Sequence, residues 1–191
     1  MLYPLPAVLV STGDESGKSN ILTIAWTGTV CTNPPMLYIS VRPERYSFPM
    51  LRSTGEFVVN LTTQKLAQAV DYCGVRSGRD TDKWKDTGLH PGKAETLQYA
   101  PIIEEAPVNI ECGVTEIKEL GSHHMFLAEV RAVQVSENYL DKNGKFRLNE
   151  AELLAYSHGE YRALAQALGS FGYSVRKKKN KVKHTDRKIK G

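Results

Sequence analysis

The stretch Asn20-Ile-Leu-Thr-Ile-Ala-Trp-Thr27 decides the fold class of this 191-residue chain. Its bulky apolar residues alternate with small or hydroxylated ones: Leu22, Ile24 and Trp26 against Thr23, Ala25 and Thr27. Successive side chains of a strand point to opposite faces, so the alternation predicts a strand over residues 19–30. The small, hydroxylated face fits either an ordinary barrel strand or the lining of a polar site.

Antiparallel strands are predicted on both sides of this stretch. Residues 7–12 are rich in β-branched side chains and are predicted to form a strand. The turn-forming residues 13–18 join this strand to the one predicted over residues 19–30, which indicates a hairpin. Further strands are predicted over residues 36–41, 56–61, 108–120 and 125–135. Helices are predicted over residues 46–53 and 64–72, with a short helical piece over 82–87 inside a long polar loop, 74–99. Regular β-α alternation is absent, so we expect a mainly β fold, an antiparallel barrel with peripheral helices.

Positive charge is concentrated at the C-terminal end of the chain. The formal net charge is +4. Residues 176–191 contain nine Lys or Arg and one Asp, a net charge of +8, so residues 1–175 carry −4. An acidic body argues against a folded nucleic-acid-binding face. We expect one domain over residues 1–174 and a basic, disordered tail over residues 175–191.

The sequence also excludes several other classes of protein. No apolar run approaches the ~18 residues that span a bilayer, and the proline-containing residues 1–10 do not resemble a signal peptide. Cys31, Cys73 and Cys112 are widely spaced and form no Cys-x-x-Cys pair, so we expect them to pack in a reducing cytoplasm. His123 and His124 are adjacent and would point to opposite faces of a strand, so no metal site is predicted.

Two motifs of nucleotide-binding proteins fail on their spacing. Residues 13–19 end in Gly-Lys-Ser, but their glycines are one residue too close for a phosphate loop, and a strand is predicted where that loop needs a helix. The Gly-x-Gly-x-x-Gly pattern of a dinucleotide-binding βαβ unit does not occur. A nucleotide site of either kind is not expected.

Several short motifs in a fixed order carry a resemblance to a known family. They are the stretch quoted above, Cys31-Thr-Asn-Pro-Pro35, Arg42-Pro-Glu-Arg-Tyr-Ser47, Phe57-Val-Val-Asn60, Asp71-Tyr-Cys-Gly74, Ser77-Gly-Arg-Asp-Thr-Asp-Lys83 and Gly121-Ser-His123. In this order they resemble the flavin reductase-like, FMN-binding split-barrel family, and within it the flavoredoxin branch, over about residues 3–173. The resemblance implies a six-stranded Greek-key split barrel that forms a homodimer and binds FMN in a groove to which both subunits can contribute.

The resemblance places the flavin ring against the first predicted strand. It implies contacts from Thr23, Ala25, Trp26 and Thr27, with Ala25 and Trp26 contributing through the main chain. An isoalloxazine ring needs an apolar wall on one side and hydrogen-bond donors along its polar edge. Small side chains beside accessible backbone N–H groups suit that requirement.

Phosphate and ribityl contacts are expected where two predicted helices begin, because N–H groups and the helix dipole favour an anion there. Arg45 and Ser47 introduce the first helix, and three residues precede the second: Asn60, Leu61 and Thr62. The alternative is that Ser47 and Thr62 only cap helices while Arg45 is solvated. Lys83 would reach the phosphate from the long loop, or form a surface ion pair.

The remaining expected contacts lie later in the chain. By the resemblance, His123 binds the nicotinamide of the electron donor; the alternative is an exposed loop histidine. Tyr156 and Tyr161, with Gly159 between them, resemble the C-terminal aromatic pair of the family. This pair would cover the flavin or the dimer interface; the alternative is that both tyrosines only pack in the core or the interface.

These expectations describe an oxidoreductase that passes electrons from NADH or NADPH through bound FMN to a flavin or protein acceptor. One alternative is a flavoredoxin-type electron carrier without NAD(P)H activity of its own, served by a redox protein partner. The other is a non-redox FMN-binding module. Neither a membrane nor a specific nucleic acid is expected as a partner.

Overall fold

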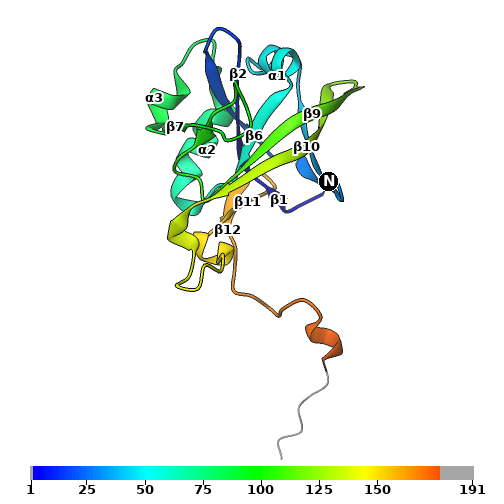
Figure 1. Cartoon of the computed structure of the whole chain (residues 1–191), viewed down its shortest axis with the longest axis vertical. Coiled ribbons are helices and arrows are strands. Elements are labelled where there is room, and N and C mark those ends of the chain that lie inside the picture. Colours follow the sequence, from blue (N-terminus) through cyan, green and yellow to red (C-terminus); the bar gives the residue numbers. More distant parts are fainter. Residues whose placement is uncertain (1, 177–191) are drawn as a thin grey trace, which may run out of the picture.

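The computed structural model describes residues 2–176 and is built around one antiparallel sheet (Figure 1). Seven strands follow one another in the order β3-β2-β6-β9-β10-β5-β4. Their bounds are Val8–Gly13 (β2), Ser19–Ile24 (β3), Thr27–Thr32 (β4), Pro35–Val41 (β5), Glu56–Asn60 (β6), Val108–Leu120 (β9) and His123–Val135 (β10). The mainly β, antiparallel architecture predicted from the sequence is confirmed.

The strand predicted over residues 19–30 is wrong in one respect: it is broken at Ala25 and Trp26 into β3 and β4. These two strands are the opposite edges of the sheet, yet only two residues join them. The sheet must therefore curl until its edges meet, which makes it a barrel split between β3 and β4. The Trp26 carbonyl accepts a hydrogen bond from the Ser40 N–H at 2.9 Å beside the break. Because of this break, the large sheet has seven strands where six were predicted.

Helices cover the outside of the barrel close to their predicted positions. The helix predicted over residues 46–53 is α1 (Phe48–Thr54), which ends at Gly55 in a left-handed conformation with φ of 66°. The helix predicted over 64–72 begins as a 3₁₀ turn, η1 (Gln64–Leu66), and continues as α2 (Ala67–Val75). The helical piece in the long loop is α3 (Lys83–Thr87), where the Asp82 carboxylate accepts a hydrogen bond from the Lys85 N–H.

Short strands complete the part of the chain that the structure describes. β1 (Leu5–Pro6), β11 (Leu154–Ser157) and β12 (Glu160–Ala163) form a three-stranded sheet, and β7 (Pro91–Gly92) pairs with β8 (Ile102–Ile103). Three more 3₁₀ turns are η2 (Glu137–Tyr139), η3 (Leu148–Ala151) and η4 (Tyr173–Val175). Of the expected disordered tail, residues 175–191, the structure describes only the first two. Residues 177–191 lie outside the described residues, so the prediction of disorder is not tested there.

Two hydrophobic clusters hold these elements together. One fills the barrel and includes Phe57, Cys112 and Phe126; the other lies between the barrel and α2 and includes Val70 and Cys73. Both cysteines are thus packed in the interior, where burial raises the pKa of Cys73 to about 11 and that of Cys112 to about 12. Neither is a reactive thiolate at neutral pH.

Candidate functional site

Two adjoining cavities lie between β3 and the end of α2, and the β3–β4 break and the small sheet of β1, β11 and β12 border the first of them. The first, of about 370 Å³, is called here the aromatic cavity, since its lining includes Tyr3, Trp26, His123, Tyr156 and Tyr161. The second, of about 380 Å³, is the cationic cavity, lined by Arg42, Arg45, Arg76, Arg79 and Lys83 among others. Thr23, Arg42, Arg45, Gly74 and Val75 belong to both linings. The two cavities therefore form one groove with an aromatic half and a cationic half.

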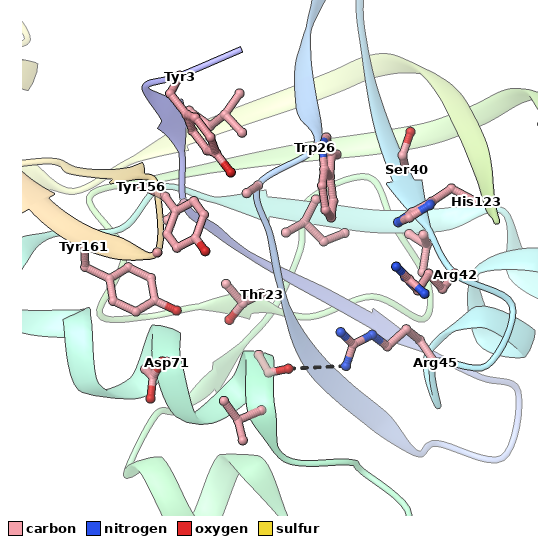
Figure 2. A pocket seen from close by; sticks show the side chains of 18 residues that line it. Tyr3, Thr23, Trp26, Ser40, Arg42, Arg45, Asp71, His123, Tyr156 and Tyr161 are labelled. Atoms are coloured by element: carbon pink, nitrogen blue, oxygen red, sulfur yellow. Dashed lines mark hydrogen bonds between the residues drawn. The ribbon is translucent and has the colours of Figure 1, made fainter. Parts of the chain in front are cut away.

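Aromatic rings stand on opposite sides of the aromatic cavity, as Figure 2 shows. On one side Tyr156 and Tyr161 are cross-strand neighbours in β11 and β12, with ring centroids 5.6 Å apart. On the other side the rings of Trp26 and His123 meet edge to face at 5.1 Å. Trp26 is 56% exposed because the β3–β4 break turns it out of the barrel. A flat aromatic ligand would find apolar walls between the two sides.

The surroundings of His123 favour the neutral form of its ring at physiological pH. Burial lowers its pKa, and the nearby positive charges of Arg42 and Arg45 lower it further. The Ser122 hydroxyl lies 2.9 Å from the Nδ1 atom of the ring. A neutral imidazole against the Trp26 ring can contact an aromatic ligand without the cost of desolvating a charge.

Lys83 is the buried cation of the groove. Its side chain is 4% exposed, and Nζ donates hydrogen bonds of 2.8 Å to the main-chain carbonyls of Ile21 and Cys73. No carboxylate of the described residues pairs with it, and burial lowers its pKa to about 8. A buried ammonium held only by carbonyls lacks a counter-charge, which an anion in the cationic cavity would supply.

Ser47 and Asn20 extend this buried polar surface. The Asn20 Nδ2 atom donates a 2.8 Å hydrogen bond to Ser47 Oγ, and both side chains are buried. Ser47 precedes α1 but makes no side-chain capping bond, so among the described residues its hydroxyl proton has no acceptor. The reading of Ser47 as a mere helix cap is therefore disfavoured, because its hydroxyl is left to donate toward the cavity.

Arginines at the rim are held by main-chain carbonyls instead of by carboxylates. Arg45 donates to the Gly74 carbonyl at 3.2 Å, a bond drawn in Figure 2, and Arg79 donates to the Glu44 carbonyl at 3.1 Å. Neither arginine, nor Arg42 or Arg76, forms an ion pair within the described part of the chain. Their charges are thus available to a ligand.

The segment after α2 lies very close to β3. A Cβ atom added at Gly78 would stand 2.5 Å from Asn20 Oδ1 and 2.5 Å from the Tyr46 ring, so only glycine allows this approach. In residues 2–176 the backbone N–H groups of Ser77 and Gly78 have no hydrogen-bond partner, and both residues line the cationic cavity. Unpaired N–H groups beside arginines add to the capacity of the site for an anion.

Seven of the eleven residues expected from the sequence meet in this groove. Thr23, Ala25, Trp26 and His123 line its aromatic half, Ser47 and Lys83 its cationic half, and Arg45 both; Thr23 lines both as well. The Thr23 hydroxyl, however, donates to the Val70 carbonyl, so its polar atom already has a partner in α2.

Thr27, Asn60, Leu61 and Thr62 line neither cavity. The Thr27 hydroxyl donates to the Tyr38 carbonyl at 2.6 Å, because the β3–β4 break places Thr27 in the opposite edge strand. Asn60 is fully buried and bridges β2 and the Ile103 N–H, while the Thr62 hydroxyl donates to the Ala7 carbonyl. Their polar groups tie strands together and are not free for a ligand.

Several groove residues were not predicted from the sequence, among them Tyr3, Arg42, Asp71, Arg76 and Arg79. Three of them stood inside quoted motifs, since Arg42 begins one, Asp71 begins another and Arg79 lies in a third. The sequence signal is the presence of three arginines within two short segments, but only the fold shows that these segments meet.

Among the described residues, no group of three or more His, Cys, Asp or Glu side chains is placed to hold a metal ion.

Comparison with known proteins decides the family. The family described as "Flavin reductase like domain" matches residues 1–165. The chain belongs to the flavin reductase-like family. Every residue that lines the two cavities lies inside the matched part, from Tyr3 to Tyr161.

Relatives of this flavin reductase-like chain include proteins of known structure. Flavoredoxin of Desulfovibrio vulgaris is 29% identical, with a TM-score of 0.84 over 92% of this chain and 95% of that one. An FMN-binding protein from Thermus thermophilus is 25% identical, with a TM-score of 0.75 over 88% of this chain and 90% of that one. An uncharacterized protein of Aeropyrum pernix is 31% identical over 82% of this chain, which spans 58% of that relative's length. The split-barrel fold is thus shared with flavoredoxin.

Proposed function

We propose that the groove binds FMN and that the protein passes electrons from NADH or NADPH to a flavin or protein acceptor. One observation carries the proposal: an aromatic-walled cavity continues into a cavity whose five cationic side chains have no ion-pair partner among the described residues. A planar ring joined to a phosphate has the matching chemistry at its two ends. The family and the similarity to flavoredoxin support the redox assignment.

The residues of the groove fit the two ends of FMN. Trp26, Tyr156 and Tyr161 provide walls for the isoalloxazine ring, and Lys83 and Ser47 provide donors for the phosphate. FMN, when bound, accepts the two electrons of NAD(P)H and releases them to the acceptor. The protein supplies binding, orientation and a neutral His123 at the face where a nicotinamide ring would approach.

The first test compares FMN with riboflavin, which lacks the phosphate. We expect FMN to bind at least ~30-fold more tightly, because charge-assisted hydrogen bonds to a phosphate contribute ~1.5–3 kcal/mol each. Quenching of flavin fluorescence during titration of the apoprotein measures both affinities. Equal affinities would show that the cationic cavity does not hold the phosphate.

A second function is favoured by the similarity to flavoredoxin, which is 29% identical over most of this chain. A flavoredoxin-type carrier would use the same groove but receive electrons from another protein. Anaerobic mixing of the FMN-loaded protein with NADH or NADPH separates the two functions. Rapid bleaching of the flavin absorbance supports the reductase, whereas bleaching only by a reduced protein donor supports the carrier.

Flavin affinity should depend on pH through Lys83. Its pKa of about 8 lies below the ordinary 10.5 because burial disfavours the charged form, and a bound phosphate favours that form. FMN binding therefore takes up a proton above pH 8, and we expect the affinity to fall about 5-fold between pH 8 and pH 9, because the protonated fraction of Lys83 drops from about one half to about one tenth. Titrations with FMN at both pH values measure this loss. Riboflavin titrated in parallel is the control, because its binding should not change.

A homodimer and a cytoplasmic location are part of the same proposal. Large apolar side chains are exposed on the barrel, among them Val30, Leu120 and Val133, which supports an interface between two copies. Sedimentation of the FMN-loaded protein measures its oligomeric state.

None of the helices in the described residues is long and apolar enough to cross a membrane.

A further inference from the structure

The cationic cavity carries more positive charge than one FMN phosphate can balance. Its lining holds four arginines and Lys83 against a single carboxylate, that of Glu44. With Lys83 protonated this is a net charge of +4, whereas a phosphomonoester brings only about −1.5 to −2 at pH 7. At least two cationic side chains are therefore left over once FMN is bound.

The polar groups that line the cationic cavity include an inner and an outer set, with Arg45 between them in both cavities. The inner set, Lys83 with Ser47 and Asn20, is buried and fixed by hydrogen bonds, which suits a ligand that stays in place. The outer set, Arg42, Arg76 and Arg79, is exposed at the rim. Exposed arginines at the mouth of a cavity suit a ligand that enters and leaves with each cycle.

The outer set begins beside the place expected for the nicotinamide. Arg42 lines both cavities, and its side chain lies next to His123 in Figure 2. Glu44 connects Arg42 with Arg79, because it lies two residues after Arg42 and its carbonyl accepts the hydrogen bond from Arg79. Positive charge thus runs from His123 along the rim to the segment after α2. A dinucleotide with its nicotinamide ring at His123 would extend along this path.

Arginine guanidinium groups bind phosphomonoesters through paired hydrogen bonds, and an arginine is a common partner of the 2′-phosphate that distinguishes NADPH from NADH. The unpaired N–H groups of Ser77 and Gly78 lie between Arg76 and Arg79 and add two more donors. We infer that the outer set, Arg42, Arg76 and Arg79, binds the 2′-phosphate of NADPH and makes it the preferred nicotinamide donor. This inference rests on the proposed FMN site.

The test uses the FMN-loaded protein and two small probes, adenosine 2′,5′-bisphosphate and adenosine 5′-monophosphate. Calorimetric titration should show the bisphosphate binding at least ~10-fold more tightly, and Arg79→Ala should remove about tenfold of that affinity. Arg52→Ala is the matched control, because Arg52 is an exposed arginine of α1 that lines neither cavity. The same Arg79→Ala variant should raise KM for NADPH about tenfold and leave KM for NADH unchanged.

Three results would overturn the inference. Equal binding of the two probes would show that no second phosphate is recognised. Release of FMN by the bisphosphate, seen as recovered flavin fluorescence, would show that only one anion site exists. Tighter binding of FAD than of FMN, lost in Arg79→Ala, would assign the extra charge to a flavin diphosphate. A protein that never retains FMN fails earlier, by its colourless spectrum, so the two proposals fail separately.

Discussion

Replacement of Lys83 by methionine is expected to weaken FMN binding at pH 7 by about 30-fold or more. The ammonium is buried, and it has no carboxylate partner among the described residues. Two of its three protons are used by the carbonyls of Ile21 and Cys73, so one remains for a ligand in the cationic cavity. Methionine keeps the length and apolar body of the side chain but removes the charge.

Three comparisons make this result specific. Lys85→Met changes an exposed lysine of the same short helix and should leave FMN affinity unchanged. Riboflavin should bind Lys83→Met and the original protein within about threefold of each other, because it lacks the phosphate. The variant should also lose the fall in FMN affinity between pH 8 and pH 9. An equal loss of riboflavin affinity would mean that Lys83 only supports the local fold.

The position of Lys83 shows what the sequence could and could not predict about the site. The motif that contains Lys83 predicts a phosphate contact, which stays a prediction; the alternative of a surface ion pair is wrong, because Lys83 is buried and donates to carbonyls. Burial of a lysine in a polar loop leaves no periodic pattern in the sequence. It depends on α3 packing against β3, which lie far apart in the chain.

The break at Ala25 and Trp26 could not be read from the alternation of side chains. Large and small residues continue to alternate through it, so the pattern of one long strand and that of two short strands are the same. The break is decided by closure of the barrel, in which β3 pairs with β2 and β4 pairs with β5. Closure is a property of the whole sheet, which explains why the alternation predicts Thr27 beside Thr23 whereas the structure places Thr27 in the opposite edge strand, outside both cavities.

Asn60 and Thr62 show how packing can occupy polar side chains that a sequence pattern assigns to a ligand. Polar residues at the end of a strand and before a helix are typical of an anion site, so the sequence predicts phosphate or ribityl contacts for both. In the folded chain their side chains satisfy main-chain groups of β1–β2 and β8, a demand that arises only from packing. The arginines after α2 belong to a predicted polar loop, and nothing local in the sequence distinguishes a solvated arginine from one at a cavity.

A buried carboxylate that lines neither cavity supports the barrel in a way that the sequence does not reveal. Glu111, in β9, is 0% exposed and accepts hydrogen bonds from the Glu95 N–H, from the Thr96 N–H and hydroxyl, and from Gln134 Nε2, all at 2.6–2.8 Å. Burial opposes its ionisation, but these donors outweigh burial and lower its pKa. Glu111 thereby fastens the segment between β7 and β8 to the barrel wall.

Glu111→Ala is expected to lower the free energy of unfolding by about 3–5 kcal/mol, because it removes a fully buried carboxylate and its four hydrogen bonds; only the Gln134 amide keeps another acceptor, the Lys93 carbonyl. Glu111→Gln keeps the shape but offers one acceptor oxygen, so about 2 kcal/mol should be lost. Urea denaturation measures both, and Glu116→Ala, an exposed position of the same strand, should change the free energy by no more than about 0.5 kcal/mol.

Urea denaturation at low pH separates the stabilising effect of the Glu111 charge from that of its packing. Its folded pKa lies below the ordinary 4.5, so its stabilising contribution is complete above pH 4.5 and is lost as the pH falls through the folded value. The difference between the original protein and Glu111→Gln should therefore shrink in urea titrations below pH 4. A difference that stays constant with pH would mean that shape, and not charge, makes Glu111 stabilising.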